Sequence, residues 1–376
     1  MSFAGSDTSR AVAFPTDYAS ILDRINQIDP VEYGKTRNFV NGAVTYLSPY
    51  ISRGVISVKQ VQESVLERGF SRRAIEKFLQ ELAWREYFQR VWQTRGDSLF
   101  QDIKYPQSNV VHHQMIESIA NATTGIDAID QSINEFYNTG YLHNHVRMYI
   151  ASITCNIGRA HWFLPSRWMY AHLLDGDLAS NTCSWQWVAG AFASKKYYCN
   201  QENLNRYMQS PQQNTFLDVA PEILPAISIP SSLKVTISWK LETLLPSVPR
   251  PRIDVTKPTL LYNSYNLDPL WRQKEDVNRI LLLEPTHFQK FPVSERVLAF
   301  ILALAKNIQG IQVMVGEVSD VEALYGDFPG VGKMFLSKEH PAFTHYPGIK
   351  DERDWLYPHV AGYYPSFFSF WKRCAK

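Results

Sequence analysis

The stretch from Thr139 to Gly190 places polar and charged side chains inside an apolar sequence with helical periodicity. Asn144, Arg147 and Met148 occupy positions i, i+3 and i+4 of this stretch. Residues at that spacing share one face of an α-helix, so the three side chains should point the same way. A chain that buries such a face must supply polar partners for it, and this requirement limits the folds open to the sequence.

The second half of the stretch adds Asp175, Asp177 and Asn181, which are interleaved with leucines. A carboxylate in apolar surroundings needs a cation or hydrogen-bond donors, because burying a bare charge is unfavourable. Arg147 is the obvious cation for one of the two carboxylates. A structural Arg–Asp pair in a helical core is the simpler explanation for any single pair. The full set of polar groups favours a binding site.

Composition and charge describe a globular chain without a strong electrostatic field. The chain has 376 residues, of which 45% are hydrophobic and 13% aromatic, and its formal net charge is +2. The length fits two domains or one large domain. Because the net charge is small, any binding to nucleic acid requires a local basic patch.

The cysteines and the apolar segments indicate the compartment. The four cysteines include no C-x-x-C pair, which argues against a zinc site and against a disulfide framework. The N-terminal residues lack the apolar region of a signal peptide, and the apolar run at 297–305 is too short to span a bilayer. We therefore expect a cytoplasmic monomer with free thiols and no membrane partner.

Two changes of pattern divide the chain. Residues 1–212 have helical periodicity, with Ser57 as the expected N-cap of a helix at 58–67. Residues 213–257 are rich in proline and predict a connector. Residues 258–376 contain the runs TLLYNSYNL, RILLLEP and IQVMVGEV, with a helix at 294–307 between the last two. This pattern predicts a smaller, doubly wound α/β domain of Rossmann-like type, without a glycine-rich nucleotide motif.

Five motifs follow one another along the helical part. They are VTYLSPY at 44–50, ELAWREYF at 81–88, TGYLHN-x-x-RM at 139–148, LLDGDLASN at 173–181 and SWQWVAG at 184–190. In this order and spacing they resemble the flavin-binding domain of the photolyase/cryptochrome family. The resemblance implies an all-helical FAD-binding domain followed by the α/β domain, although the family normally has these two in the opposite order. It leaves the antenna chromophore open.

The resemblance implies FAD as the cofactor and assigns residues to it. Backbone N–H groups and small hydroxyls of the first motif suit a pyrophosphate, although Tyr46 stands where the family often has a basic residue. Arg147 is expected to pair with Asp175, Asp177 to meet the pyrimidine edge of the flavin, and Asn181 to lie near its N5. The implied cofactor-binding residues are Tyr33, Thr45, Tyr46, Leu47, Ser48, Arg85, Asn144, Arg147, Asp175, Asp177 and Asn181.

Further residues are assigned to a substrate by the same resemblance. Glu81 would hydrogen-bond a damaged base if desolvation keeps the carboxyl protonated, and Trp84 would stack on that base, with core packing as the alternative. The implied substrate-binding residues are Phe78, Glu81, Trp84, Tyr141, Asn144, Met148 and Trp187. The implied catalytic residues are Glu81, Asn181, Trp185, Trp162 and Met148.

Trp185 and Trp162 match the two inner members of the family's electron-hopping chain. The alternative for both is core packing, which is the role of most buried tryptophans. Asn109 occupies the position of the outer tryptophan. Another aromatic residue, such as Tyr105, would therefore have to complete the path.

The residues and the resemblance together predict a blue-light-driven, FAD-dependent deoxyribodipyrimidine photolyase. Such a carbon–carbon lyase splits cyclobutane pyrimidine dimers in damaged DNA. Relatives that act on (6-4) lesions carry histidines on the helix that bears the arginine, whereas this chain has Asn144 and Met148 there. The alternative is a cryptochrome-like flavin photoreceptor without repair activity, which the small net charge, Phe78, Tyr46 and the incomplete tryptophan chain favour. A flavin-binding relative with neither activity is a third possibility.

Overall fold

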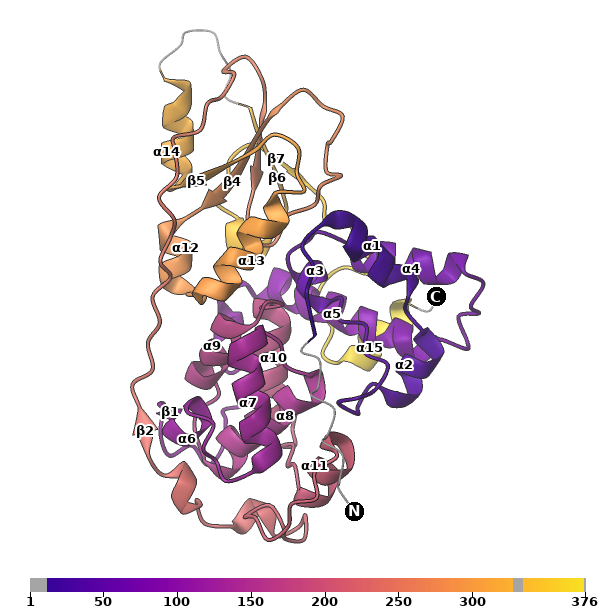
Figure 1. Ribbon diagram of the computed structural model, residues 1–376, viewed down its shortest axis with the longest axis vertical. Coiled ribbons are helices and arrows are strands. Elements are labelled where there is room, and N and C mark those ends of the chain that lie inside the picture. Colours follow the sequence, from indigo (N-terminus) through magenta and orange to yellow (C-terminus); the bar gives the residue numbers. More distant parts are fainter. Residues whose placement is uncertain (1–11, 327–333, 375–376) are drawn as a thin grey trace, which may run out of the picture.

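The computed structural model describes residues 12–326 and 334–374. A helical part and a parallel sheet follow each other along the long axis of the molecule, with the sheet uppermost in Figure 1. None of the described helices has the length and apolar composition that crossing a lipid bilayer requires. The α-helices of the helical part are α1 (Tyr18–Asn26), α2 (Pro30–Thr36), α3 (Ser48–Ser52), α4 (Val58–Glu67), α5 (Glu76–Arg95), α6 (Glu117–Ala120), α7 (Asp127–Thr139), α8 (Asn144–Ser152), α9 (Phe163–His172), α10 (Leu178–Ala189) and α11 (Gln201–Met208).

Local sequence explains where several of these helices begin and end. Ser57 precedes α4 and accepts the backbone N–H of Gln60 at 3.0 Å, so the predicted N-cap is confirmed. Asp29 caps α2 in the same way. Gly140 ends α7 and Gly190 ends α10, both in the left-handed conformation that glycine adopts without strain. The chain can therefore turn sharply just before α8 and just after α10.

The sheet is five-stranded and parallel within the described residues. Its strands are β3 (Thr259–Tyr262), β4 (Asn278–Leu283), β5 (Ile311–Val315), β6 (Phe335–Lys338) and β7 (Ile349–Asp351). Their spatial order is β5-β4-β3-β6-β7, so the chain moves outward from β3, crosses over, and adds the last two strands on the other side. The parallel sheet predicted from the apolar runs is confirmed. The helices that follow β4 and later strands are α12 (Pro285–Lys290), α13 (Glu295–Ala305), α14 (Val318–Glu322) and α15 (Phe367–Cys374).

The proline-rich segment between the two parts lies along the helical one (Figure 1). Its strand β2 (Thr236–Ile237) pairs in antiparallel fashion with β1 (Met115–Ile116), which precedes α6. The segment thus contacts the helical part before it reaches the sheet, as expected of a connector. The domain boundaries at 212 and 257 stay a prediction.

Arg53 ties the helical part to the end of β3. Its side chain is fully buried and donates to the carbonyl oxygens of Leu173 at 3.4 Å, Leu174 at 3.0 Å and Ser264 at 3.5 Å. A buried guanidinium is tolerated when its donors find acceptors in this way. The loop that carries Asp175 is therefore fixed by Arg53, which lies between the helical part and the sheet.

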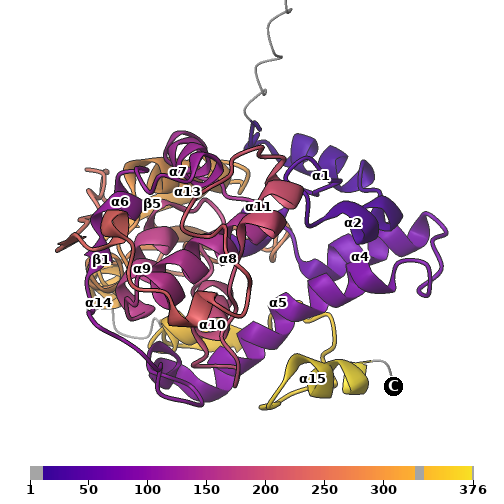
Figure 2. The same ribbon diagram turned by 90° about the horizontal axis from the view of Figure 1, so that it is seen from below.

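Residues that follow the sheet return to α5. Glu86, on α5, accepts the backbone N–H groups of Leu356 at 2.5 Å and Tyr357 at 3.0 Å. Burial raises the pKa of the Glu86 carboxyl. Figures 1 and 2 show α15 lying beside α5. The final described helix therefore belongs spatially to the helical part.

Candidate functional site

A cavity of about 520 Å³ opens within the helical part, and this volume is typical of a ligand-binding pocket. Its wall comes from α2, the turn before α3, α5, α8, the loop before α10, and α10 itself. The predicted site residues on this wall are Tyr33, Thr45, Tyr46, Leu47, Ser48, Phe78, Glu81, Trp84, Arg85, Tyr141, Asn144, Arg147, Met148, Asp175, Asp177, Asn181, Trp185 and Trp187. Trp162 is fully buried elsewhere. The fold thus gathers all five motifs around one space.

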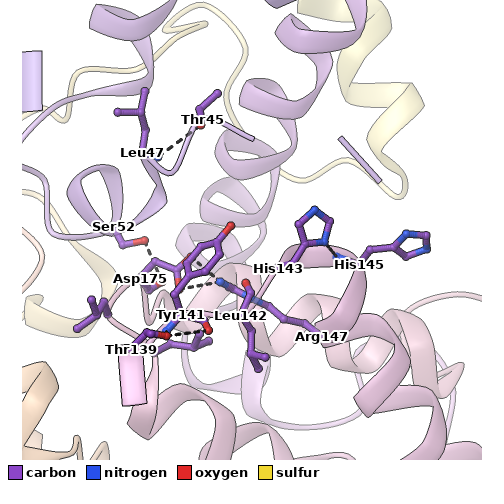
Figure 3. Close-up of polar contacts among 12 residues, drawn as sticks. Thr45, Leu47, Ser52, Thr139, Tyr141, Leu142, His143, His145, Arg147 and Asp175 are labelled. Atoms are coloured by element: carbon purple, nitrogen blue, oxygen red, sulfur yellow. Dashed lines mark hydrogen bonds and ion pairs between the residues drawn. The ribbon is translucent and has the colours of Figure 1, made fainter. Parts of the chain in front are cut away.

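The ion pair between Arg147 and Asp175 lies in the wall of the cavity (Figure 3). One guanidinium nitrogen of Arg147 lies 3.0 and 2.8 Å from the two carboxylate oxygens, and the Asp175 side chain is 4% exposed. The Nε of Arg147 donates to the carbonyl of Leu142, and the hydroxyl of Ser52 donates to the backbone carbonyl of Asp175, both at 2.9 Å. The ion pair expected from the sequence is present. Each of its two residues is also held by a further hydrogen bond.

Asp177 is held in a single orientation by three donors. One carboxylate oxygen caps α10 by accepting the N–H of Ser180 at 2.7 Å. The other accepts the Gln89 side chain at 2.5 Å and the Arg85 guanidinium at 3.3 Å. Only 3% of the Asp177 side chain is exposed. Hydrogen bonds of this kind satisfy the oxygens of a buried carboxylate and fix its orientation.

Asn181 lies one turn into α10 and lines the same cavity. Its amide nitrogen donates to the backbone carbonyl of Ser166 at 2.8 Å. This bond uses the donor end of the amide, so the oxygen remains as an acceptor. An acceptor at this position suits a ring N–H group in the cavity.

The surroundings of Glu81 differ from those that the sequence analysis assumed. The expectation was a carboxyl group kept protonated by apolar neighbours. The carboxylate instead lies 3.1 Å from Nε of Arg37, and Lys77 is 3.9 Å away on the outer side. The Glu81 side chain is 27% exposed. Glu81 is therefore an ion-paired group at the edge of the cavity, and its neighbours are charged rather than apolar.

Trp84 packs against the last described helix. Its ring lies parallel to the ring of Phe367 on α15, with centroids 3.9 Å apart and an angle of 9° between the planes. Phe367 itself is buried, whereas its neighbour Phe368 is 61% exposed. One face of Trp84 is therefore covered by α15, a contact that the sequence analysis did not anticipate.

The turn at 44–48 carries Tyr46 in a left-handed backbone conformation, with φ of 54°. Such a conformation is uncommon for a residue other than glycine and marks a constrained turn. The Tyr46 ring packs against Tyr141, with centroids 5.3 Å apart. Tyr46 is thus held in an aromatic cluster, and Thr45, Leu47 and Ser48 remain the polar and backbone groups of this wall.

Three residues of the site were missed from the sequence. Arg37 follows Tyr33 by one helical turn, and Gln89 follows Arg85 by one turn, so helical spacing from predicted residues could have indicated both. His143 also lines the cavity, and burial lowers its pKa to about 4. The imidazole is therefore neutral at pH 7, where it caps α8 by accepting the N–H of His145.

Residues 78–220 match the model of a protein family described as the FAD binding domain of DNA photolyase. The match includes α5, α8 and α10, which carry most of the cavity wall. This segment is similar to the FAD-binding domain of DNA photolyases. The photolyase-type domain thus coincides with the part of the chain in which the polar groups converge.

Similar proteins carry both names of the family. A deoxyribodipyrimidine photo-lyase of Alkalihalophilus pseudofirmus is 32% identical over 146 residues, which are 38% of this chain and 30% of that protein. A cryptochrome DASH of Natronomonas pharaonis is 28% identical over 186 residues, 47% of this chain and 39% of that protein. A solved Synechocystis cryptochrome has a TM-score of 0.47 and 24% identity, over 55% of this chain and 46% of that one. The chain spans less than half the length of these relatives.

FAD is the cofactor of the photolyase-type domain. The cavity fits it, because Arg147, Asp177 and Asn181 offer oriented charges and an acceptor. The hydroxyl of Ser180 and the indole N–H of Trp185 are buried on the same wall without a partner among the described residues. Buried polar atoms of this kind are normally satisfied, and a bound group would satisfy them. When bound, FAD supplies light absorption and one-electron chemistry.

The first prediction concerns cofactor content. Purified protein, made with ample riboflavin, is expected to retain one FAD per chain, because the wall of the cavity presents charges in fixed orientations. The flavin released by heat is measured by its absorbance against protein concentration. A supernatant without flavin would contradict the assignment.

Proposed function

We propose that this protein is a blue-light-driven, FAD-dependent photolyase that splits cyclobutane pyrimidine dimers in damaged DNA. The observation that carries the proposal is the convergence of two groups of side chains on one cavity. Arg147, Asp177 and Asn181 form the group suited to the flavin, and Glu81 and Trp84 form the group suited to a damaged base. Electron transfer between the two ligands requires that they lie close together.

The side chains act by binding and orientation. The Arg147–Asp175 pair and Asp177 would hold the bound flavin through charges that are fixed in orientation. Glu81, oriented by Arg37, offers oxygen acceptors to the N–H groups of a pyrimidine. Asn144 and Met148 on α8 supply an amide and an apolar contact between these groups, in place of the histidines expected for (6-4) lesions.

The proposal is tested with a DNA oligonucleotide that contains a single thymine dimer. Chemically reduced protein under blue light should restore the two thymines, and the same mixture in the dark should not. Chromatography of the digested oligonucleotide measures the restored bases. If the dimer persists under light in protein that carries FAD, the repair activity is excluded and the flavin assignment stands.

A second candidate function is a flavin photoreceptor without repair activity. The observation that favours it is the stacking of Phe367 on Trp84 at 3.9 Å, because this contact covers one of the two faces of the ring proposed to stack on a damaged base. In this function, light-driven changes at the flavin would be passed to a partner protein. The two candidates differ in what removal of Phe367 should do.

Replacing Phe367 with leucine should raise the affinity for dimer-containing DNA by about tenfold if Trp84 stacks on the lesion, because base–aromatic stacking contributes roughly 1–3 kcal/mol. Fluorescence anisotropy of a labelled oligonucleotide measures the change. Phe368→Leu is the matched control, since that side chain is 61% exposed and should leave the affinity unchanged. Unaltered binding in Phe367→Leu would count against a stacking role for Trp84.

The tryptophans of the helical part are proposed to carry electrons toward the flavin. Trp185 lines the cavity, and Trp162 lies in the same buried cluster away from it. Replacing either with phenylalanine is expected to slow light-driven reduction of the bound flavin while FAD content stays the same, because the apolar ring fills the space without being readily oxidised. Absorbance under steady blue light measures the rate. Equal rates in both variants and the unaltered protein would exclude this path.

A further inference from the structure

Trp162 is held by an unusual set of polar contacts for a fully buried tryptophan. Its indole N–H donates to the carboxylate of Asp102 at 2.6 Å. Its backbone N–H donates to the side-chain oxygen of Gln107 at 2.9 Å, and the Gln107 backbone N–H donates to the second Asp102 oxygen at 2.9 Å. The segment 102–107 therefore forms a cradle that fixes the carboxylate against the indole nitrogen.

The other buried tryptophan of the relay lacks such a partner. The indole N–H of Trp185 has no hydrogen-bond acceptor among the residues that the structure describes. The two rings therefore differ in one respect that matters for redox chemistry. An oxidised indole is a much stronger acid than a neutral one, so it loses its N–H proton when a base is in contact. Of these two tryptophans, Trp162 alone has a carboxylate in that position among the described residues.

We propose that Asp102 is the proton acceptor of the relay and that Trp162 is its terminal electron donor. The inference rests on the proposed electron path through Trp185 and Trp162. Trp185 gives one electron to the light-excited, oxidised flavin and is restored by one electron from Trp162. The Trp162 N–H bond then breaks, its proton forms an O–H bond on Asp102, and a neutral indole radical remains. One electron and one proton have left Trp162, and no further aromatic residue is required.

The location of Asp102 lets the proton leave. Its side chain is 25% exposed, whereas Trp162 is fully buried, so the carboxyl group connects a buried indole with solvent. The imidazole of His161 lies 3.5 Å from the same carboxylate oxygen and is also partly exposed. Burial lowers the pKa of His161, and its Nδ1 accepts the backbone N–H of Phe163 at 3.3 Å, so the neutral ring presents an Nε2 donor to Asp102 and the proton's exit is the exposed side of the carboxyl group. Asn109, at the position of the missing outer tryptophan, is on the surface and does not need to be redox-active.

Loss of the proton also favours electron transfer toward the flavin over the return of the electron to Trp162. Return of an electron to the neutral Trp162 radical requires the proton to come back as well, which slows recombination. The carboxylate further stabilises the positive charge that forms on Trp162 before the proton moves. Trp185 has neither advantage, so the oxidised site should move from Trp185 to Trp162 and remain there.

The experiment is a blue laser flash on the full-length, FAD-loaded protein, followed by transient absorption and electron paramagnetic resonance of the tryptophan radical. We expect a deprotonated radical whose formation is slower in deuterium oxide and independent of buffer concentration. In Asp102→Asn the yield of this radical should fall by about tenfold or more, the scale of a hydrogen bond to a charged group. Tyr137→Phe is the matched control, because it removes the acceptor of another buried indole, that of Trp168 at 2.8 Å.

A second readout does not depend on the flavin. The ¹⁵N-labelled indole N–H of Trp162, assigned by its loss in Trp162→Phe, should resonate far downfield and move in Asp102→Asn. If Asp102→Asn loses FAD, this NMR measurement still tests the contact between Asp102 and Trp162. The isotope and buffer measurements on the unaltered protein then still test the proton transfer. Deprotonation at the original rate in Asp102→Asn, or a rate that rises with buffer concentration, would overturn the role of Asp102. An unchanged radical in Trp162→Phe would overturn the electron path itself.

Discussion

Replacing Asp175 with alanine is expected to lower the free energy of unfolding by about 3 kcal/mol and to abolish retention of FAD. The carboxylate is 4% exposed and lies 2.8 Å from the Arg147 guanidinium, which is 21% exposed. Its removal leaves a largely buried cation without a counter-ion, and partial solvent access to Arg147 keeps the loss near the lower end for buried pairs. Urea denaturation followed by circular dichroism measures stability, and flavin fluorescence after desalting measures retention.

The matched control is Glu32→Ala. Glu32 pairs with Lys35 at 3.2 Å on the surface, where both side chains are substantially exposed. Surface pairs contribute about 0–1 kcal/mol, so the stability and the FAD content should change little. An Asp175→Ala protein with the original stability and bound FAD would show that the pair does not support the cavity.

Replacing Glu81 with alanine is expected to slow dimer splitting by about ten- to a hundredfold, because an acceptor for the damaged base is lost. The flavin spectrum should barely change, since Glu81 lies at the Arg37 edge of the cavity. Asn181→Ala should do the opposite, destabilising the reduced cofactor while dimer-containing DNA still binds. Lys77→Ala is the control, because this ammonium lies 3.9 Å from the same carboxylate but is 45% exposed.

If the protein is a photoreceptor without repair activity, the Glu81→Ala and Asn181→Ala variants should behave differently from this. A photoreceptor would respond to Asn181→Ala and be indifferent to Glu81→Ala. If dimer repair is measurable and Glu81→Ala proceeds at the full rate, this edge of the cavity does not contact the lesion. The role proposed for Trp84, one turn along α5, would then lose its support as well.

Features that depend on neighbouring residues could be predicted from the sequence. The N-cap at Ser57 follows from the residue type before a periodic stretch, and the strands β3, β4 and β5 follow from apolar runs bounded by turns, whereas β6 and β7 were not predicted. An ion pair between Arg147 and one of the two aspartates was also expected from the residues, and the family resemblance assigned it to Asp175. In each case the information lies within one motif or between adjacent ones.

Contacts between distant segments could not be predicted in this way. Arg37 and Glu81 are 44 residues apart, and nothing in either motif indicates that they meet. The stacking of Phe367 on Trp84 depends on how the chain returns after the sheet. The indole–carboxylate contact between Trp162 and Asp102 likewise joins segments 60 residues apart. Such contacts are set by the path of the whole chain, which local periodicity does not encode.

The return of the chain to α5 has a consequence for synthesis. The carboxylate of Glu86 is buried against backbone N–H groups that are 270 and 271 residues further along the chain. At a translation rate of about 5–20 residues per second, these groups emerge roughly 15–50 s after α5 does. During that interval α15 is not yet packed beside α5, and the Glu86 carboxylate lacks the N–H donors of Leu356 and Tyr357. The nascent helical part therefore lacks these contacts until residues 356 and 357 have left the ribosome.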